Sequence, residues 1–381
     1  MKKCSACLLP SRAPGADITN GLCAHCRGGD GASQGGGIYH RPEQKADLTE
    51  AIASCLSRSS GRYDCLVALS GGKDSCYLLH RLTVEHGLRA LAFTVGGHLP
   101  EVAWSNIRRT VAKLDVDHLV YTPPADFYRR MVRHLLTHQE PRGAVRTVCY
   151  VCAPLTEGYA LQVATGEGIP LVFAGYSPGQ PEPGRLVYEF PREMIAETDW
   201  TPPVLRDSGL FGAGELERFW NPKRYPAGTR FPRFIAPFHA WDYSQEEVMK
   251  AVVELGLIRN RKHASPVHSN CRLNWLLMYS DLRNLGYNPY APEFARLIRE
   301  GRASRSYWRM MQPVVDWMIR HRAFLGRNVT RSLRHLGLEA DDLRIVSREE
   351  SPEEAGGSCR CLRNGTPPAP AAAEPKLGGA V

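Results

Sequence analysis

Residues 63–75 read YDCLVALSGGKDS, and the interpretation of the whole chain starts from them. The apolar run at residues 63–69 favours a strand, and a helix is expected to begin at Ser75 after a short loop. Gly71 and Gly72 allow backbone N–H groups to approach an anion closely, because no Cβ stands in the way. The start of the helix adds free N–H donors and the positive end of a dipole.

The side chains of this loop suit phosphate. Two serines carry hydroxyl donors, and Lys73 supplies a positive charge. Asp74 cannot cradle phosphate directly, so we interpret it as a metal ligand or a brace of the loop. The spacing differs from the Walker loop, which needs four residues between its glycines. The predicted nucleotide-binding residues of the loop are Ser70, Gly71, Gly72, Lys73, Asp74 and Ser75.

The string SGGKDS between a strand and a helix resembles the pyrophosphate loop (PP-loop) of the ATP pyrophosphatase, or adenine nucleotide alpha-hydrolase, superfamily. Those enzymes cut ATP between the α- and β-phosphates and adenylate a substrate oxygen. The resemblance implies ATP and Mg²⁺ as cofactors, Lys73 and Asp74 as catalytic residues, and a doubly wound parallel sheet of the HUP-like type. Alternating strand and helix patterns after residue 63 also favour an α/β fold with parallel strands.

Three further residues are expected near the nucleotide, because ligands of such sheets lie at the carboxyl ends of the strands. The expected elements are strands at 88–95, 118–121 and 170–175 and a helix at 101–114. Gly97 follows the second strand, where the superfamily carries an Asp-Asn-Gly, and Asn106 matches an asparagine of the superfamily's next helix. Gly175 ends the strand at 170–175 and is expected to let the backbone approach the nucleotide. The alternative for Asn106 is a helix residue that faces solvent.

The N-terminus carries two C-x-x-C pairs separated by fifteen residues. Cys4, Cys7, Cys23 and Cys26 can place four thiolates around one Zn²⁺, and the segment has too few apolar residues for a core of its own. We predict a zinc ribbon. The motif CSACLLPSRAP…NGLCAHC resembles the N-terminal ribbon of N-acetyl sugar amidotransferases, which are PP-loop proteins, and some PP-loop enzymes that thiolate tRNA also begin with a ribbon.

A third C-x-x-C, Cys149 and Cys152, is expected at the start of a helix at 155–164. It can be a redox pair, half a zinc site, or two ligands of an iron–sulfur cluster. Its position resembles that in PP-loop enzymes that thiolate tRNA, where a later cysteine completes a three-cysteine [4Fe–4S] site. The resemblance makes Cys271 the third ligand and gives all three cysteines a catalytic role. Cys359 and Cys361 form a further pair, in the tail.

The remaining cysteines and the tryptophans are interpreted as core residues. Cys55, Cys65 and Cys76 stand in apolar or helical settings and are expected to be small buried hydrophobes. Trp275, Trp308 and Trp317 stand in predicted helices and are also assigned to the core, with a platform for stacking bases as the alternative.

The chain of 381 residues carries a net charge of +9, and twelve arginines lie between residues 296 and 348. This basic region favours an anionic partner such as RNA or a phosphorylated small molecule, with a solvated basic face as the alternative. No run of eighteen apolar residues is present, so a cytoplasmic protein without a membrane span is expected.

The sequence divides into five parts. These are a zinc ribbon at 1–27, a linker and helix at 28–60, the PP-loop domain at 61–240 with an irregular insertion at 180–232, an Arg-rich helical region at 241–348, and a disordered tail at 349–381. The insertion is either a lid or a surface elaboration.

The favoured function is ATP-dependent replacement of a carbonyl or amide oxygen by sulfur, as in [4Fe–4S]-dependent tRNA-thiolating enzymes. The alternative is an N-acetyl sugar amidotransferase that introduces nitrogen derived from ammonia. The expected partners are an anionic acceptor (tRNA or a nucleotide sugar) and either a sulfur donor or a glutaminase subunit, and a homodimer is left open.

Overall fold

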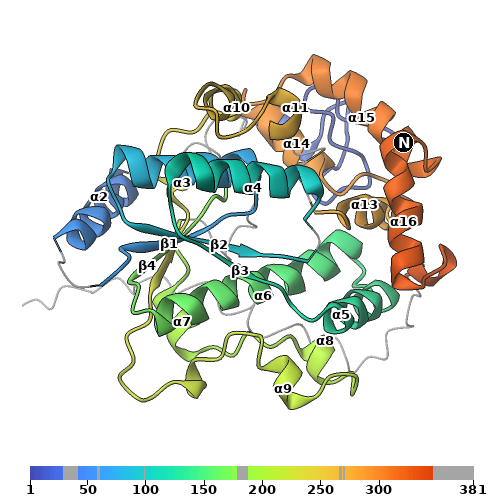
Figure 1. Cartoon of the computed structure of the whole chain (residues 1–381). Coiled ribbons are helices and arrows are strands. Elements are labelled where there is room, and N and C mark those ends of the chain that lie inside the picture. The colour runs from blue at the N-terminus through green and yellow to red at the C-terminus, as the bar shows by residue number, and fades with distance from the viewer. Residues whose placement is uncertain are drawn as a thin grey trace, which may run out of the picture.

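A parallel β-sheet lies at the centre of the chain (Figure 1). The computed structural model describes residues 1–28, 42–57, 61–97, 99–177, 188–265, 268 and 271–345. The five strands are β1 (Cys65–Ala68), β2 (Ala90–Val95), β3 (His118–Tyr121), β4 (Leu171–Ala174) and β5 (Arg233–Ile235). They are all parallel and follow the order β3-β2-β1-β4-β5, which confirms the predicted α/β class.

Both faces of the sheet are covered, as a parallel sheet requires. Helices α2 (Pro42–Leu56), α3 (Lys73–His80) and α4 (Glu101–Leu114) lie on one face, and α5 (Ala125–Thr137) and α6 (Ala144–Gly166) lie on the other (Figure 1). Successive strand residues therefore enter different cores: Leu66 packs with the α5 and α6 side, and Val67 packs with the α3 side. The cores enclose Cys55, Cys65 and Cys76, which confirms that these are small buried residues.

The strand order reverses direction at β1. The chain proceeds from β1 to β2 and β3 on one side, and later fills β4 and β5 on the other. Such a reversal opens a crevice beyond the carboxyl ends of the two central strands. The loop at residues 70–75 leaves β1 at this point. The helix after it begins at Lys73 rather than at Ser75 and ends in a π-helical turn, η1 (Arg81–Glu85).

Local patterns located two elements accurately. Helix α4 and strand β3 have the bounds that the sequence predicted, 101–114 and 118–121. The expectation that Cys149 and Cys152 stand at the start of a helix is wrong, because α6 begins at Ala144 and continues through Pro154. Both cysteines lie in the interior of this helix.

The start of α6 is fixed from a distant helix. Asp281 of α13 (Asn274–Asn284) accepts hydrogen bonds from the backbone N–H groups of Ala144 and Val145. The buried carboxylate that caps the helix therefore stands at least 136 residues away from the helix start in the sequence. No local sequence pattern can indicate such a cap. Gly143 precedes this cap, and a Cβ there would lie 2.3 Å from the Asp281 carboxylate.

The insertion packs as an aromatic layer beneath α5 and α6. Its described elements are α7 (Arg192–Glu197), α8 (Pro203–Arg206), α9 (Ala213–Leu216) and η2 (Pro222–Arg224). Trp200 and Trp220 are buried and donate their indole N–H groups to the backbone oxygens of Met194 and Ile195. No described residue of 188–232 lines the cavity described below, and the aromatic side chains of this part pack into the core that contains α5 and α6.

The C-terminal helices cover the helices of both faces, with the first of them packed on α3 and α13 packed on α6 (Figure 1). They are α10 (Gln245–Glu254), α11 (Arg261–Ala264), α13, α14 (Ala291–Arg299), α15 (Arg305–Arg320), η4 (Phe324–Gly326), α16 (Arg327–Leu336) and η5 (Asp341–Leu343), and η3 (Pro237–His239) precedes them. Of the three tryptophans assigned to the core, Trp275 is buried and Trp308 is half-buried. The assignment is wrong for Trp317, which is 48% exposed.

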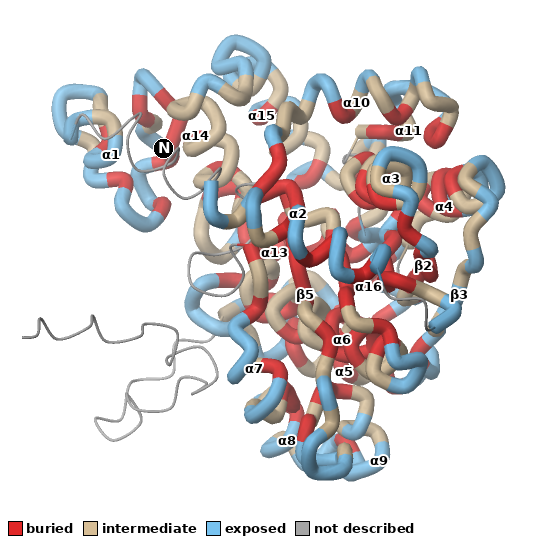
Figure 2. The backbone as a smooth tube through the Cα atoms, turned by 90° about the vertical axis from the view of Figure 1, so that its left-hand side faces the viewer, coloured by how far each residue is buried: buried red, intermediate tan, exposed pale blue. Residues whose placement is uncertain are grey.

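The N-terminal segment, with α1 (Ala24–Arg27), lies beside α14 (Figure 2). Residues 29–41 of the linker, His98, and the tail from 346 with Cys359 and Cys361 lie outside the described residues. Within the described part of the chain, no helix combines the length and apolar character needed to cross a membrane.

The Asp281 cap can be tested by its effect on stability. Asp281→Ala leaves two buried N–H groups without an acceptor, so we expect the free energy of unfolding to fall by about 2–4 kcal/mol. Asp281→Asn keeps one acceptor oxygen and should cost less. Urea denaturation followed by circular dichroism measures both variants, and an alanine variant as stable as the wild type would disprove the cap.

Candidate functional site

The loop at residues 70–75, called the PP-loop below after the motif it resembles, has a backbone conformation that only glycine suits at its second position. Gly71 has a φ of +77°, and a Cβ there would lie 2.4 Å from the carbonyl oxygen of Ala103. Ser75 closes the loop, because its hydroxyl donates to the Gly72 carbonyl at 3.1 Å and accepts from the Ser70 N–H at 3.2 Å. The loop is therefore preformed, and the first-turn N–H groups of α3 face outward from it.

Asn106 holds the loop from behind. It is 1% exposed, and its Nδ2 donates to the carbonyl oxygens of Gly71 at 2.9 Å and His263 at 3.0 Å. The interpretation of Asn106 as a solvent-facing residue is therefore wrong. It does not line the cavity, so the structure places it as a support of the loop.

Gly175 and Gly97 differ in their surroundings. A Cβ on Gly175 would lie 2.9 Å from the backbone nitrogen of Ser75, so glycine lets β4 end against the first turn of α3. Gly97 has a φ of +153° and no atom within 4 Å of its Cβ position. Nucleotide contacts of these two glycines stay predictions.

Lys73, Asp74 and Tyr243 form a closed polar triangle. The Lys73 ammonium donates to Asp74 Oδ2 at 2.6 Å and to the Tyr243 hydroxyl at 3.1 Å, and that hydroxyl donates to Asp74 Oδ1 at 2.8 Å. Burial, followed by the charge of Asp74, raises the pKa of Tyr243 well above its usual range, so its hydroxyl stays protonated. Asp74 thus braces Lys73 and Tyr243, and its role as a metal ligand stays a prediction.

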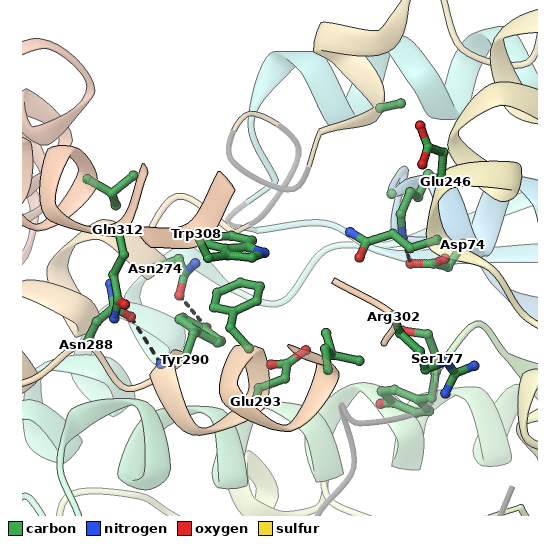
Figure 3. Close-up of a pocket in the computed structure, with 18 of the residues that line it drawn as sticks. Asp74, Ser177, Glu246, Asn274, Asn288, Tyr290, Glu293, Arg302, Trp308 and Gln312 are labelled. Carbon is green, nitrogen blue, oxygen red and sulfur yellow. Dashed lines mark hydrogen bonds and ion pairs between the residues drawn. The ribbon is translucent and has the colours of Figure 1, made fainter. Parts of the chain in front are cut away.

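A cavity of about 740 Å³ opens beside this triangle (Figure 3). Its walls come from the PP-loop, the end of β4, α6 and the C-terminal helices. Gly72, Lys73 and Asp74 lie at one end, and Tyr176 and Ser177 follow from β4. Cys149 lines the same cavity from α6. The structure thus brings the predicted phosphate loop and one predicted catalytic cysteine to a single space.

The other two predicted cluster cysteines lie near Cys149. Burial raises the pKa of the Cys149 thiol, and the charges of Cys152 and Cys271 raise it further. Burial also raises the pKa of Cys152 to about 12, although the Tyr128 hydroxyl, 3.0 Å from its sulfur, acts in the opposite direction. Cys271 is exposed at the surface, yet neighbouring atoms still desolvate its thiol and raise its pKa. The pKa shifts of Cys149 and Cys152 thus indicate that Cys271 lies near both thiols.

The end of the cavity remote from the PP-loop is neutral. Trp308 stacks on Phe294 with ring centroids 3.6 Å apart. The amide oxygen of Asn274 accepts from the Tyr290 hydroxyl at 2.6 Å, which directs the amide NH₂ away from that contact. The amide oxygen of Gln312 faces Lys3 of the N-terminal segment at 3.3 Å, since an ammonium can only donate. In the part of the chain that the structure describes, no hydrogen bond occupies the NH₂ group of either amide.

The four N-terminal cysteines meet as a metal site requires. All four sulfurs lie within 4.8 Å of one another, and those of Cys7 and Cys23 are 3.6 Å apart. A tetrahedral Zn²⁺ with bonds of about 2.3 Å holds sulfurs at roughly 3.8 Å. The donor set and its spacing therefore fit zinc. Among the described residues, this is the one group of three or more ligand atoms within that 4.8 Å limit.

Arginines of the C-terminal region bind the ribbon and the cavity wall. Arg299 of α14 donates to the Cys7 sulfur at 3.3 Å, and Arg305 of α15 donates to the carbonyl oxygen of Ser5. Arg302 donates to the carbonyl oxygen of Tyr243 at 2.9 Å. Part of the arginine-rich region, predicted as a surface for an anionic partner, is thus occupied by internal contacts.

Most residues of the cavity wall were not predicted from the sequence. Tyr243, Glu293, Asn274 and Gln312 line it, but none belongs to a motif with a recognisable spacing. The available signal was weak: Tyr243 directly precedes the capping serine of α10, Ser244, and the amino ends of helices beside a sheet often face a site.

Comparisons with known proteins bear on this fold only weakly. No family model and no curated protein matches the sequence. An NMN synthetase from Francisella tularensis is 10% identical over 80% of this chain and 96% of its own, with a TM-score of 0.33. A U34-tRNA thiolase, NcsA, from Methanococcus maripaludis, solved with its [4Fe–4S] cluster, is 14% identical over 89% and 90%, with a TM-score of 0.33.

An NH₃-dependent NAD synthetase from Campylobacter jejuni is 11% identical over 77% of this chain and 95% of its own, with a TM-score of 0.32. Overlap at this level carries no information about the reaction. The function proposed below therefore rests on the residues of this chain.

The ribbon should bind about one zinc ion per chain through its four thiolates. Cys7→Ser should lose this zinc, and amide hydrogen exchange in α14 should speed up, because the Arg299 contact to Cys7 weakens. Elemental analysis and exchange mass spectrometry measure the two effects. Cys271→Ser is the matched control and should keep its zinc, whereas full zinc in Cys7→Ser would exclude the site.

Proposed function

We propose that this chain is an AMP-forming enzyme that activates a carbonyl or amide oxygen with ATP and then replaces that oxygen with sulfur. One observation carries the proposal: Cys149 and the PP-loop residues Gly72, Lys73 and Asp74 line the same cavity. Activation and replacement of one oxygen must take place at one carbon atom, so the groups that perform them must share a space.

The PP-loop end of the cavity binds the triphosphate of MgATP. The loop and the first turn of α3 direct N–H groups at the phosphates, and Lys73 neutralises charge that develops on the departing pyrophosphate. Tyr243 and Asp74 hold the Lys73 ammonium in the cavity before ATP arrives, at 3.1 and 2.6 Å. The substrate oxygen bonds to the α-phosphorus, the bond to the bridging oxygen breaks, and pyrophosphate leaves.

The cysteine group suits an iron–sulfur cluster. A lone zinc ion would draw three sulfurs to within roughly 3.8 Å of one another. The charges of Cys152 and Cys271 act on Cys149, but the three sulfurs do not all lie within 4.8 Å of one another. Cysteine thiolates are the ligands of [4Fe–4S] clusters, so these three residues would hold three of its four irons. The chemistry such a cluster supplies is an iron atom without a protein ligand, open to sulfide.

The neutral end of the cavity receives the acceptor. Asn274 and Gln312 offer amide N–H donors, and the stacked pair of Trp308 and Phe294 offers an apolar face. In the second step, sulfur bonds to the activated carbon, the bond from carbon to oxygen breaks, and AMP leaves. The anionic acceptor, tRNA or a smaller molecule, reaches this end from the C-terminal helices, and a separate donor protein supplies the sulfur.

Amidotransfer is the second candidate, and the same neutral end favours it. Amide side chains beside an aromatic face also suit a sugar ring. The ribbon contacts this end, because Lys3 of the ribbon donates to Gln312 of α15. Nitrogen would then replace the oxygen, with ammonia from a glutaminase subunit. The iron content of the protein separates the two candidates.

Lys73→Ala should lower the rate at which MgATP is converted to AMP and pyrophosphate by about 100- to 1,000-fold, because the positive charge at the departing pyrophosphate is lost. The rate is measured by anion-exchange chromatography of the nucleotides. Lys250→Ala, on the exposed side of α10, is the control and should retain wild-type activity. Unchanged AMP formation in Lys73→Ala, or ADP as the product, would contradict the ATP chemistry.

The anaerobically purified protein should contain about four iron atoms per chain in addition to zinc. Cys152→Ala should lose the iron and keep the zinc, whereas Cys76→Ala, with a thiol outside both groups, should keep both metals. Elemental analysis and the visible absorption spectrum measure this. Zinc without iron in an active protein would favour amidotransfer.

A further inference from the structure

Glu293 stands in the first turn of α14, between the two halves of the cavity (Figure 3). Its carboxylate interacts electrostatically with Lys73 and Asp74 of the PP-loop. On the other side, Tyr290 interacts with both Glu293 and Cys149. The Glu293 carboxyl is therefore placed where the nucleotide end and the cysteine end of the cavity meet.

Glu293 also differs from the other carboxyl groups of the cavity in its contacts. Three carboxyl side chains of the described residues line the cavity. Asp74 is bonded to Lys73 and Tyr243, and Glu246 is largely exposed and pairs with Arg261 at 3.4 Å. In the described part of the chain, no hydrogen bond or ion pair holds the carboxyl of Glu293, so it is free to meet a ligand.

The surroundings of Glu293 tune its proton affinity. Burial raises its pKa to about 7, with Lys73 acting in the opposite direction and Asp74 in the same one. A base works best when its pKa lies near the working pH. The titratable and charged groups around it are Lys73, Asp74, Tyr243, Glu246, Tyr290, Arg296, Arg302 and Cys149. Burial raises the pKa of Cys149, Tyr243 and Tyr290, which moves them further from neutrality.

We propose that Glu293 is the proton acceptor of the activation step, an assignment that rests on the proposed function. The carbonyl oxygen of an acceptor amide bonds to the α-phosphorus of ATP, and the bond to the bridging oxygen breaks as pyrophosphate leaves. The electron pair of the amide N–H bond becomes the second bond between carbon and nitrogen, and the proton passes to a Glu293 carboxylate oxygen. The acceptor class is thus a carbonyl with an adjacent N–H.

Water can replace the acceptor in the test, so the probe is MgATP alone. Water bonds to the α-phosphorus, pyrophosphate leaves, and Glu293 takes the proton of the water. The rate of AMP formation by the full-length holoprotein is measured from pH 5.5 to 9, a range of about two units around a neutral base. The wild-type rate should rise with pH to a plateau with a midpoint near 7, because only the ionised carboxylate accepts a proton.

Glu293→Gln should form AMP about 100-fold more slowly at pH 8, without the midpoint near 7. Glu293→Asp should restore a pH-dependent rate, which a purely structural role would not produce. Glu254→Gln, on the exposed side of α10, is the matched control and should keep the wild-type profile. Zinc content and circular dichroism verify that each variant is folded.

The outcomes are distinguishable. If the wild type forms no AMP, the proposed function fails and the role of Glu293 fails with it. If the wild type forms AMP and Glu293→Gln keeps the midpoint near 7, the assignment of Glu293 is wrong while the proposed function stands. A shifted or missing midpoint in Glu293→Gln alone supports the assignment.

Discussion

The contact of Tyr243 with Lys73 and Asp74 joins the two parts of the molecule on which the site depends. Lys73 and Asp74 belong to the loop that leaves the central strand, and Tyr243 begins the C-terminal helical region. Because the contact is buried and all of its polar atoms are paired, it is well placed to fix the distance between the loop and the helices. The cavity exists between these two parts, so its shape depends on this contact, and Arg302 strengthens it through the carbonyl oxygen of Tyr243.

A second restraint comes from the opposite end of the chain. The ribbon, which is too small for a core of its own, packs on α14 and α15 through Arg299, Arg305 and Lys3. A metal in the ribbon would therefore stabilise the wall that carries Glu293 as well as the ribbon itself. This arrangement gives the N-terminal cysteines a physical connection to the site, although none of them lines the cavity.

Features set by neighbouring residues were predictable from the sequence. The PP-loop, α4, β3, the parallel sheet and the grouping of Cys4, Cys7, Cys23 and Cys26 follow from spacing and periodicity. Features set across the fold were not. Helix α6 begins where Asp281 caps it, and Asn106 supports the loop instead of facing solvent. Glu293 was missed because an isolated acid in an amphipathic helix has no local signature, and only the fold brings it within electrostatic reach of Lys73.

The central claim is that the PP-loop and Cys149 share one cavity. Alkylation of Cys149 by iodoacetamide in iron-free protein, followed by peptide mass spectrometry over hours because the buried thiol with its raised pKa reacts slowly, tests this most directly. A non-hydrolysable ATP analogue at ten times its Kd leaves only about a tenth of the chains free, so the alkylation rate at Cys149 should fall about tenfold. An unchanged rate at Cys149 with the analogue bound would contradict a shared cavity.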